Sequence, residues 1–376
     1  MDKRSSAKSS SGRRHRLNTG WTAGFILMFA ILALTSCRRD EPFLPADNVE
    51  SMPYPNLSDY GFFTGEMKRL EPAARVIPYD LNTPLFSDYA GKARFIYIPA
   101  GKQAVYNSDD VFDFPVGTIF IKTFYFQHDL RNPSSGRTFV ETRLIIRKSA
   151  GWEAASYVWN DSQTEAAYYV AGKNVNVSWL HYDGSTRSTL YHIPNKNECK
   201  GCHNDSEILV PIGPKARNIN KDYSYSDGVM NQLEKWASAG ILSGAPAAAA
   251  APRVPVWDDA TTGSLNDRAR AYLDINCAHC HHERGPANSS GLLLTYDEAN
   301  PTALGICKPP VAAGTGSGGL KYNIVPGKPD VSIMIYRMNS AEPDVAMPEL
   351  ARSVIHSEGV QLIRDWIASL PPAGCE

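Results

Sequence analysis

Two copies of one short sequence constrain this chain more than any other feature. Residues 199–203 read Cys-Lys-Gly-Cys-His, and residues 277–281 read Cys-Ala-His-Cys-His. Two cysteines three positions apart, followed directly by histidine, form the attachment signature of a c-type haem. Both sulfurs bind the porphyrin edge through thioether bonds, and the imidazole reaches the iron. The sequence therefore predicts two covalent haems, held by Cys199, Cys202, Cys277 and Cys280, with His203 and His281 as iron ligands.

Paired cysteines also occur in zinc sites and in simple disulfides. In zinc ribbons the two pairs are about 15–20 residues apart, and no histidine need follow each pair. Here the pairs lie much further apart in the sequence, and each has its histidine. Both alternatives are therefore less favoured than haem attachment.

The N-terminus is typical of an export signal. Basic residues precede an apolar stretch, 21–34, that is too short for an ordinary transmembrane helix. The stretch ends in Leu34-Thr35-Ser36-Cys37, which resembles the lipobox of bacterial lipoproteins. That resemblance implies cleavage before Cys37 and its acylation, with about 0.8 kcal/mol of membrane affinity per buried methylene. We expect a lipid-anchored, periplasm-facing protein, at the outer membrane rather than the inner one; a plain secretory signal or an uncleaved anchor is the alternative.

The remaining cysteines are Cys307 and Cys375, because the chain has seven in all. In an exported protein two leftover thiols usually pair. We therefore expect a Cys307–Cys375 disulfide, with two unpaired thiols as the alternative.

The length and charge of the chain limit its class. A chain of 376 residues has room for two or three domains. A formal net charge of −1 without a basic stripe argues against nucleic-acid binding. The composition pattern predicts a signal peptide (1–36), a tether (37–60), an antiparallel β domain (61–198), a first haem segment (199–244), an Ala/Pro linker (245–256) and a cytochrome c-like domain (257–376).

The predicted fold class is multidomain α+β. Short runs rich in aromatic and β-branched residues predict strands, and these runs are 93–98, 118–126, 138–146, 154–159, 166–170 and 175–180. The first haem segment is expected to be helical. The last 120 residues are expected to form an all-α domain, with one helix starting after Ser264 and another carrying the apolar stripe 362–370.

A haem iron either has a sixth ligand from the protein or keeps an open site, and this choice separates electron transfer from catalysis. The question arises first for the second haem. Met347 is the best candidate, because it lies between the haem motif and the last helix, and Pro348 favours an extended backbone there. His356 is the other candidate. Met334 and Met338 are four residues apart on an expected helix, and we assign them to the core.

The remaining ligand questions concern hydrogen bonds and the first haem. A carbonyl at or near Pro286 is expected to accept the Nδ1 proton of His281. His279 and His282 are expected to be surface residues. For the first haem, the sixth-ligand candidates are Met230, His181 and His192, and an open site is the alternative.

Several further stretches make the chain resemble a family of exported bacterial dihaem c-type cytochromes, most of which have no assigned function. The stretches are 83–89 (TPLFSDY), 115–118 (PVGT), 122–124 (KTF), 193–196 (IPNK), 213–218 (GPKARN), 325–329 (VPGKP) and 347–349 (MPE). The resemblance implies two haems, a periplasm-facing location and electron transfer, but no substrate.

Three functions remain open from the sequence. The first is a membrane-anchored relay of single electrons to or from a periplasmic or membrane redox protein. The second is a dihaem enzyme, peroxidase-like or oxidising a small nitrogen compound, with an open first haem. The third uses the β domain to bind a ligand that the haems report or modify.

Overall fold

The computed structural model describes residues 46–311, 313–372 and 374–375. The predicted signal peptide and Cys37 lie outside these residues. The described residues belong to one compact unit. Within them, no helix combines the length and the apolar character needed to cross a membrane.

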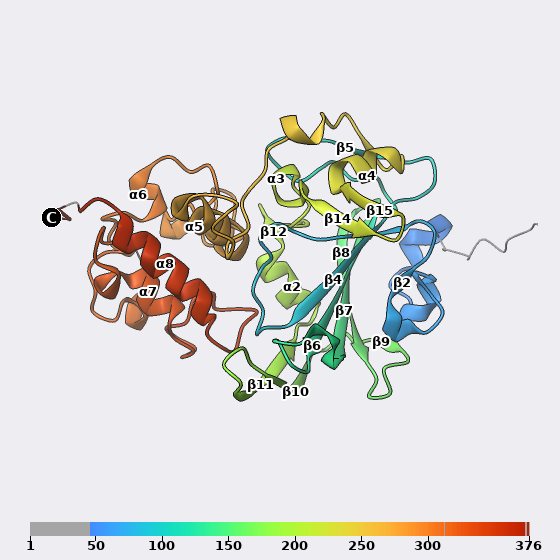
Figure 1. Ribbon diagram of the computed structural model, residues 1–376, viewed down its shortest axis with the longest axis horizontal. Helices are drawn as coiled ribbons and strands as arrows, with labels where there is room; N and C mark the ends of the chain where they lie inside the picture. The colour runs from blue at the N-terminus through green and yellow to red at the C-terminus, as the bar shows by residue number, and fades with distance from the viewer. Residues whose placement is uncertain (1–45, 312, 373, 376) are drawn as a thin grey trace, which may run out of the picture. The chain divides into compact units, whose positions relative to one another are not determined.

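A six-stranded antiparallel sheet is the largest element of the fold (Figure 1). In spatial order its strands are β3 (Val76–Tyr79), β4 (Gly91–Tyr97), β6 (Ile119–Gln127), β7 (Arg137–Lys148), β8 (Gly151–Trp159) and β9 (Ala166–Tyr168).

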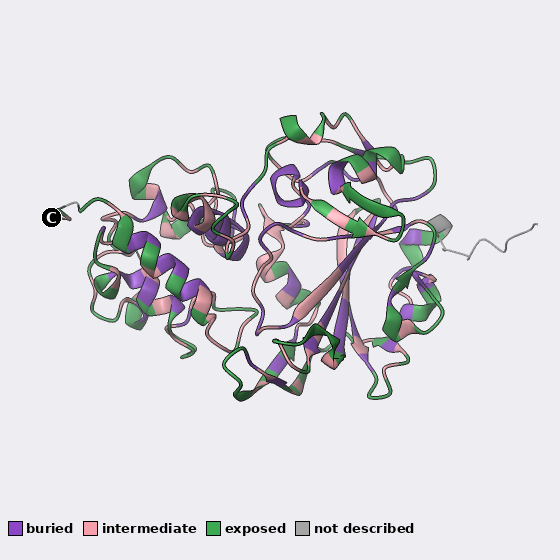
Figure 2. Cartoon of the chain, viewed as in Figure 1, coloured by how far each residue is buried: buried purple, intermediate pink, exposed green. Residues whose placement is uncertain are grey.

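Side chains alternate between the two faces of this sheet, as a strand period of two requires. Phe95 and Ile121 belong to a core on one face, which also contains Leu57 from the N-terminal segment. Ile96, the residue that follows Phe95 on β4, belongs to a second core on the opposite face, together with Trp236. Figure 2 shows the resulting burial along the central strands.

Smaller two-stranded sheets surround the main one. They pair β1 (Phe63–Thr64) with β2 (Glu71–Pro72), β10 (Lys173–Leu180) with β11 (Thr186–Ile193), β12 (Asn204–Asp205) with β13 (Ile208–Leu209), β14 (Asp222–Tyr225) with β15 (Gly228–Asn231), and β16 (Leu242–Ser243) with β5 (Ala104–Val105). Only the last pair is parallel. Two of these hairpins fall in the first haem segment, which is therefore not mainly helical.

The α-helices are short except at the C-terminus. They are α2 (Lys196–Cys202), α3 (Ala216–Ile219), α4 (Gln232–Ser238), α5 (Leu265–Leu273), α6 (Pro301–Leu304), α7 (Ile333–Met338) and α8 (Ser357–Ser369). Short 3₁₀ turns occupy 46–51, 57–60, 67–69, 133–135, 248–250, 288–290, 314–317 and 329–331. α5 and α8 pack against each other around Ala269, Ile363 and Trp366.

The predicted fold class was wrong. The chain is about 27% strand and 25% helix, and its C-terminal part is not a separate all-α domain. Between its helices this part uses long irregular connections, and Ile306 and Ile324 pair in a parallel β-bridge. The helices of this part do share a core of their own. The expectation failed because hydrogen bonds from a distant loop before β4 also join this part to the rest of the unit, and no local sequence pattern indicates them.

The segment 82–89 makes that connection. The backbone N–H of Phe86 donates to the Asn276 side chain at 2.8 Å. The Asp88 carboxylate accepts the backbone N–H groups of Ser353 and Val354 at 2.6 and 3.0 Å. Residues before and after the second haem motif in the sequence thus form hydrogen bonds with one loop that precedes β4.

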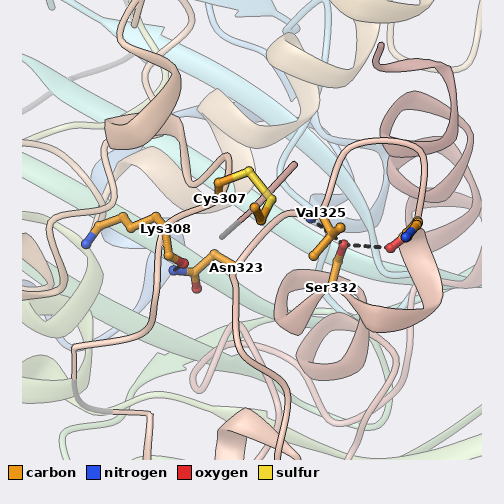
Figure 3. The surroundings of a disulfide bond; sticks show 7 residues. Cys307, Lys308, Asn323, Val325 and Ser332 are labelled. Atoms are coloured by element: carbon orange, nitrogen blue, oxygen red, sulfur yellow. Dashed lines mark hydrogen bonds between the residues drawn. A yellow bond between two sulfur atoms is a disulfide. The ribbon is translucent and has the colours of Figure 1, made fainter. Parts of the chain in front are cut away.

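A disulfide joins Cys307 and Cys375, which confirms the pairing predicted for the leftover cysteines (Figure 3). Next to it, the Asn323 amide donates to the carbonyl of Lys308 at 3.0 Å. The bond closes a loop of 68 residues, a length at which disulfides typically contribute about 2–4 kcal/mol to stability. Met347 lies within the closed segment.

Candidate haem-attachment sites

A helix and a π-helical turn present the second haem motif. The hydroxyl of Ser264 accepts the backbone N–H of Asp267 at 3.1 Å and so begins α5. After α5 the chain widens into one π-helical stretch, Asp274–Ala278, which contains Cys277. Such stretches are frequent at functional sites, because one extra residue redirects the side chains that follow.

One cavity of about 580 Å³ collects the residues predicted to hold the second haem. Cys277, Cys280, His281 and Met347 all line it. This volume falls in the range of about 300–1,000 Å³ that is usual for small-molecule sites. Much of the remaining lining is apolar and includes Leu273, Leu292, Leu294, Ile333 and Val360. Two thiols, an imidazole and a thioether around an apolar space form a donor set that fits a haem.

His281 is buried, and its ring is fixed by a hydroxyl rather than by the expected carbonyl. Its Nδ1 lies 3.2 Å from Oγ of Ser290, which itself donates to the carbonyl of Ala287 at 2.7 Å. The prediction of a carbonyl near Pro286 as the direct partner was therefore wrong. Burial lowers the pKa of His281 to about 4, so the imidazole is neutral at pH 7 and Nε2 is left for iron.

If His281 holds a haem iron, replacing Ser290 with alanine is expected to weaken the iron–imidazole bond, because partners of this kind are worth roughly 10–100-fold in metal affinity. Protons compete with iron for Nε2, so acid detachment of His281 should shift upward by about 1–2 pH units. An acid titration of the low-spin absorption bands measures this shift. Ser289→Ala is the matched control, since Ser289 lines the same cavity; equal midpoints in both variants would contradict the assignment.

The Met347 loop is held by backbone and arginine hydrogen bonds. The N–H of Met347 donates to the carbonyl of Arg337 at 3.1 Å. The Arg352 guanidinium donates to the carbonyl of Met347 at 3.0 Å and to that of Ser340 at 2.8 Å. One cation therefore ties three parts of the loop together and positions the thioether at the cavity.

His356 also lines the cavity but has other partners. Its Nδ1 lies 2.9 Å from the Tyr272 hydroxyl. Its Nε2 lies 3.8 Å from a Glu358 oxygen, and its ring stacks on Phe86 with centroids 4.1 Å apart. Nδ1 is thus engaged, and stacking on Phe86 fixes the orientation of the ring. The 3.8 Å between Nε2 and Glu358 is too long for a hydrogen bond, so His356 stays the alternative to Met347. Met338 is buried in α7 and packs in the core, although it also borders the cavity.

The first haem motif starts on α2 and ends at its C-cap. Asn195 and Glu198 form a reciprocal capping box at the start of the helix. His203 follows the last turn, and its Nδ1 lies 2.9 Å from the carbonyl of Val210. That contact again leaves Nε2 for iron. Burial, and then the Lys122 ammonium, lower the pKa of His203 to about 3 and keep the ring neutral.

The sheet face near Cys199 carries a row of cations. Arg94, Lys122 and Arg143 occupy paired positions on β4, β6 and β7. Arg94 pairs with Asp80 at 2.6 Å, and Arg143 pairs with Glu141 at 2.5 Å. Lys122 has no carboxylate within 4.0 Å among the described residues. Burial and the two arginines lower its pKa to about 7. The carboxylates of a haem are anions that such a row can neutralise.

The sixth-ligand candidates for the first haem have partners elsewhere. His181 accepts the Trp179 indole N–H at 3.3 Å. His192 is exposed between Asn174 and Glu198. Met230 lies on β15 and is 39% exposed. Among the described residues, none of the three lines a cavity that Cys202 also lines.

The two motifs meet, which nothing in the sequence indicated. The sulfurs of Cys202 and Cys280 and a ring nitrogen of His279 all lie within 4.8 Å of one another. His279 is half-buried, and its Nδ1 has no hydrogen-bond partner among the described residues. His282 is also half-buried and contacts the carbonyl of Ala278 at 2.8 Å. The prediction that both histidines are surface residues was wrong.

Two further contacts hold the motifs together. The backbone N–H of Ser206 donates to the carbonyl of Arg284 at 3.0 Å. The guanidinium of Arg284 in turn forms two hydrogen bonds of 2.7 Å with the Asp205 carboxylate. Bidentate pairs of this kind fix relative orientation as well as distance. The loops after His203 and after His281 are therefore docked against each other.

Comparison with known proteins found no relative of this chain. No protein-family model, no curated protein and no solved structure matches the chain.

Proposed function

We propose that this protein is an exported dihaem c-type cytochrome that relays single electrons. The observation that carries the proposal is the cavity shared by Cys277, Cys280, His281 and Met347. A bound haem supplies one-electron redox chemistry, and the protein sets its potential through ligands, hydrogen bonds and burial. The cavity offers all three. Met347 and His281 would be the ligands, Ser290 is the hydrogen-bond partner of His281, and the apolar lining provides the burial.

Each of the two motifs would bind one haem. Cys199 and Cys202 would bind the first haem, and Cys277 and Cys280 the second. His203 and His281 present neutral imidazoles whose Nδ1 atoms are already engaged. Acylated Cys37 would anchor the chain to a membrane facing the periplasm, where a redox protein would be the partner.

Haem content tests the proposal directly. Protein matured in a host with c-type maturation should contain two haems per chain, counted by pyridine haemochrome and by iron analysis. Replacing both cysteines of either motif with alanine should reduce the count from two to one. A colourless protein, or one containing zinc without haem, would refute the proposal.

A second candidate function is favoured by the surroundings of the first motif. His181, His192 and Met230 are all engaged or exposed elsewhere, so an open iron at that site is the alternative. The absorption spectrum of reduced protein with carbon monoxide separates the two. No change at either haem supports the relay, whereas a change that disappears with the Cys199 and Cys202 variants supports a dihaem enzyme.

A further inference from the structure

The contact between the two motifs is tighter than two independent haem sites require. Each motif contributes its second cysteine, and the two sulfurs lie within 4.8 Å of each other and of a His279 ring nitrogen. Cys280 also approaches the carbonyl of Gly201 at 3.9 Å.

We propose that Cys202, His279 and Cys280 form a junction that places the two attached haems side by side as one electronically coupled pair. This inference rests on the proposed function, since it needs both haems. Each thioether carbon is one covalent bond from its sulfur. The porphyrin edges that carry these two thioethers are therefore neighbours whenever the sulfurs are.

His279 is the spacer at this junction. One of its ring nitrogens lies within 4.8 Å of both sulfurs. His279 also borders the cavity predicted for the second haem and another cavity of about 600 Å³ that Cys202 lines as well. Its buried Nδ1 is unpartnered among the described residues. A buried polar atom without a hydrogen-bond partner is uncommon in a folded protein and calls for an explanation, such as a further group at the same place.

The rigid docking of the two loops supports a fixed separation. The Arg284–Asp205 pair and the Ser206 hydrogen bond both join the chain after one motif to the chain after the other. A pair of haems held in this way should share optical transitions. Two adjacent chromophores of similar absorption energy give a circular-dichroism couplet of opposite signs in the Soret band, in addition to the spectra that each haem gives alone.

The test uses the full matured chain after its haem content has been counted. The oxidised protein is expected to give a Soret couplet that the summed spectra of the two single-haem variants do not reproduce. Half-reduction should abolish the couplet in the wild-type protein, because the two chromophores then absorb at different energies. This second measurement needs no variant and remains informative if a variant fails to fold.

His279→Ala should change or abolish the couplet, whereas His282→Ala, the matched control on the same turn, should leave it unchanged. Two haems with a spectrum equal to the sum of the single-haem variants would overturn the junction. An unchanged couplet in His279→Ala would overturn the spacer role. Fewer than two haems would instead count against the proposed function, so the two failures are distinguishable.

Discussion

Replacing Met347 with leucine is expected to open the second haem iron and lower its potential by on the order of 100 mV, a part of the roughly 0.8 V that axial ligands span. Thioether ligation favours the ferrous state, so its loss stabilises the ferric state. Leucine has nearly the volume of methionine, and the cavity should therefore stay packed. A spectroelectrochemical titration measures the potential, and carbon monoxide binding measures the open site.

Met338→Leu is the control for this prediction. Met338 borders the same cavity but is buried in α7, so its replacement should leave both potential and spectrum unchanged. If Met347→Leu kept a six-coordinate iron while a His356 variant lost it, His356 would be the ligand. The contact of its Nδ1 with Tyr272 would then leave Nε2 for the iron.

Replacing Arg217 with methionine is expected to destabilise the protein by about 3–5 kcal/mol, the usual cost of removing one partner of a buried ion pair. Arg217 donates to Asp274 at 3.0 Å, and both side chains are only 8% exposed. Asp274 begins the π-helical stretch that contains Cys277. Denaturant unfolding of the matured protein measures the loss.

An arginine whose carboxylate partner is exposed provides the matched control. Arg364 pairs with Asp330, whose side chain is 79% exposed, and exposed pairs contribute at most about 1 kcal/mol. Arg364→Met should therefore have little effect. Adding Asp274→Asn to Arg217→Met should recover part of the stability by removing the stranded charge. If Arg217→Met and Arg364→Met lowered the free energy of unfolding equally, burial would not explain the contribution of the Arg217–Asp274 pair.

Local patterns predicted many elements well. The expected strands 93–98 and 118–126 correspond to β4 and β6, and the expected helix after Ser264 corresponds to α5. These succeed because alternation and capping depend on residues close together in sequence. The disulfide was also predictable, because counting cysteines left a single pair.

Predictions that required distant partners fared worse. Ser290 supplies the hydrogen bond assigned to a carbonyl near Pro286, because the fold of the loop decides which acceptor reaches Nδ1. The fold class failed for the same reason, because residues 82–89 form hydrogen bonds with residues of the C-terminal part that are 190 to 265 positions away in the sequence.

The sequence by itself determined which covalent bonds this protein can form. It shows which cysteines and histidines have the spacing of a haem-attachment motif, and which two thiols remain to form a disulfide. The tertiary structure alone decided that the two motifs touch, that Met347 faces the cavity of Cys277, and that the sheet and the C-terminal helices form one unit. Spacing within a motif is set by the covalent chain and needs no fold. Contact between motifs depends on packing and hydrogen bonds between segments far apart in sequence, which only the folded chain brings together.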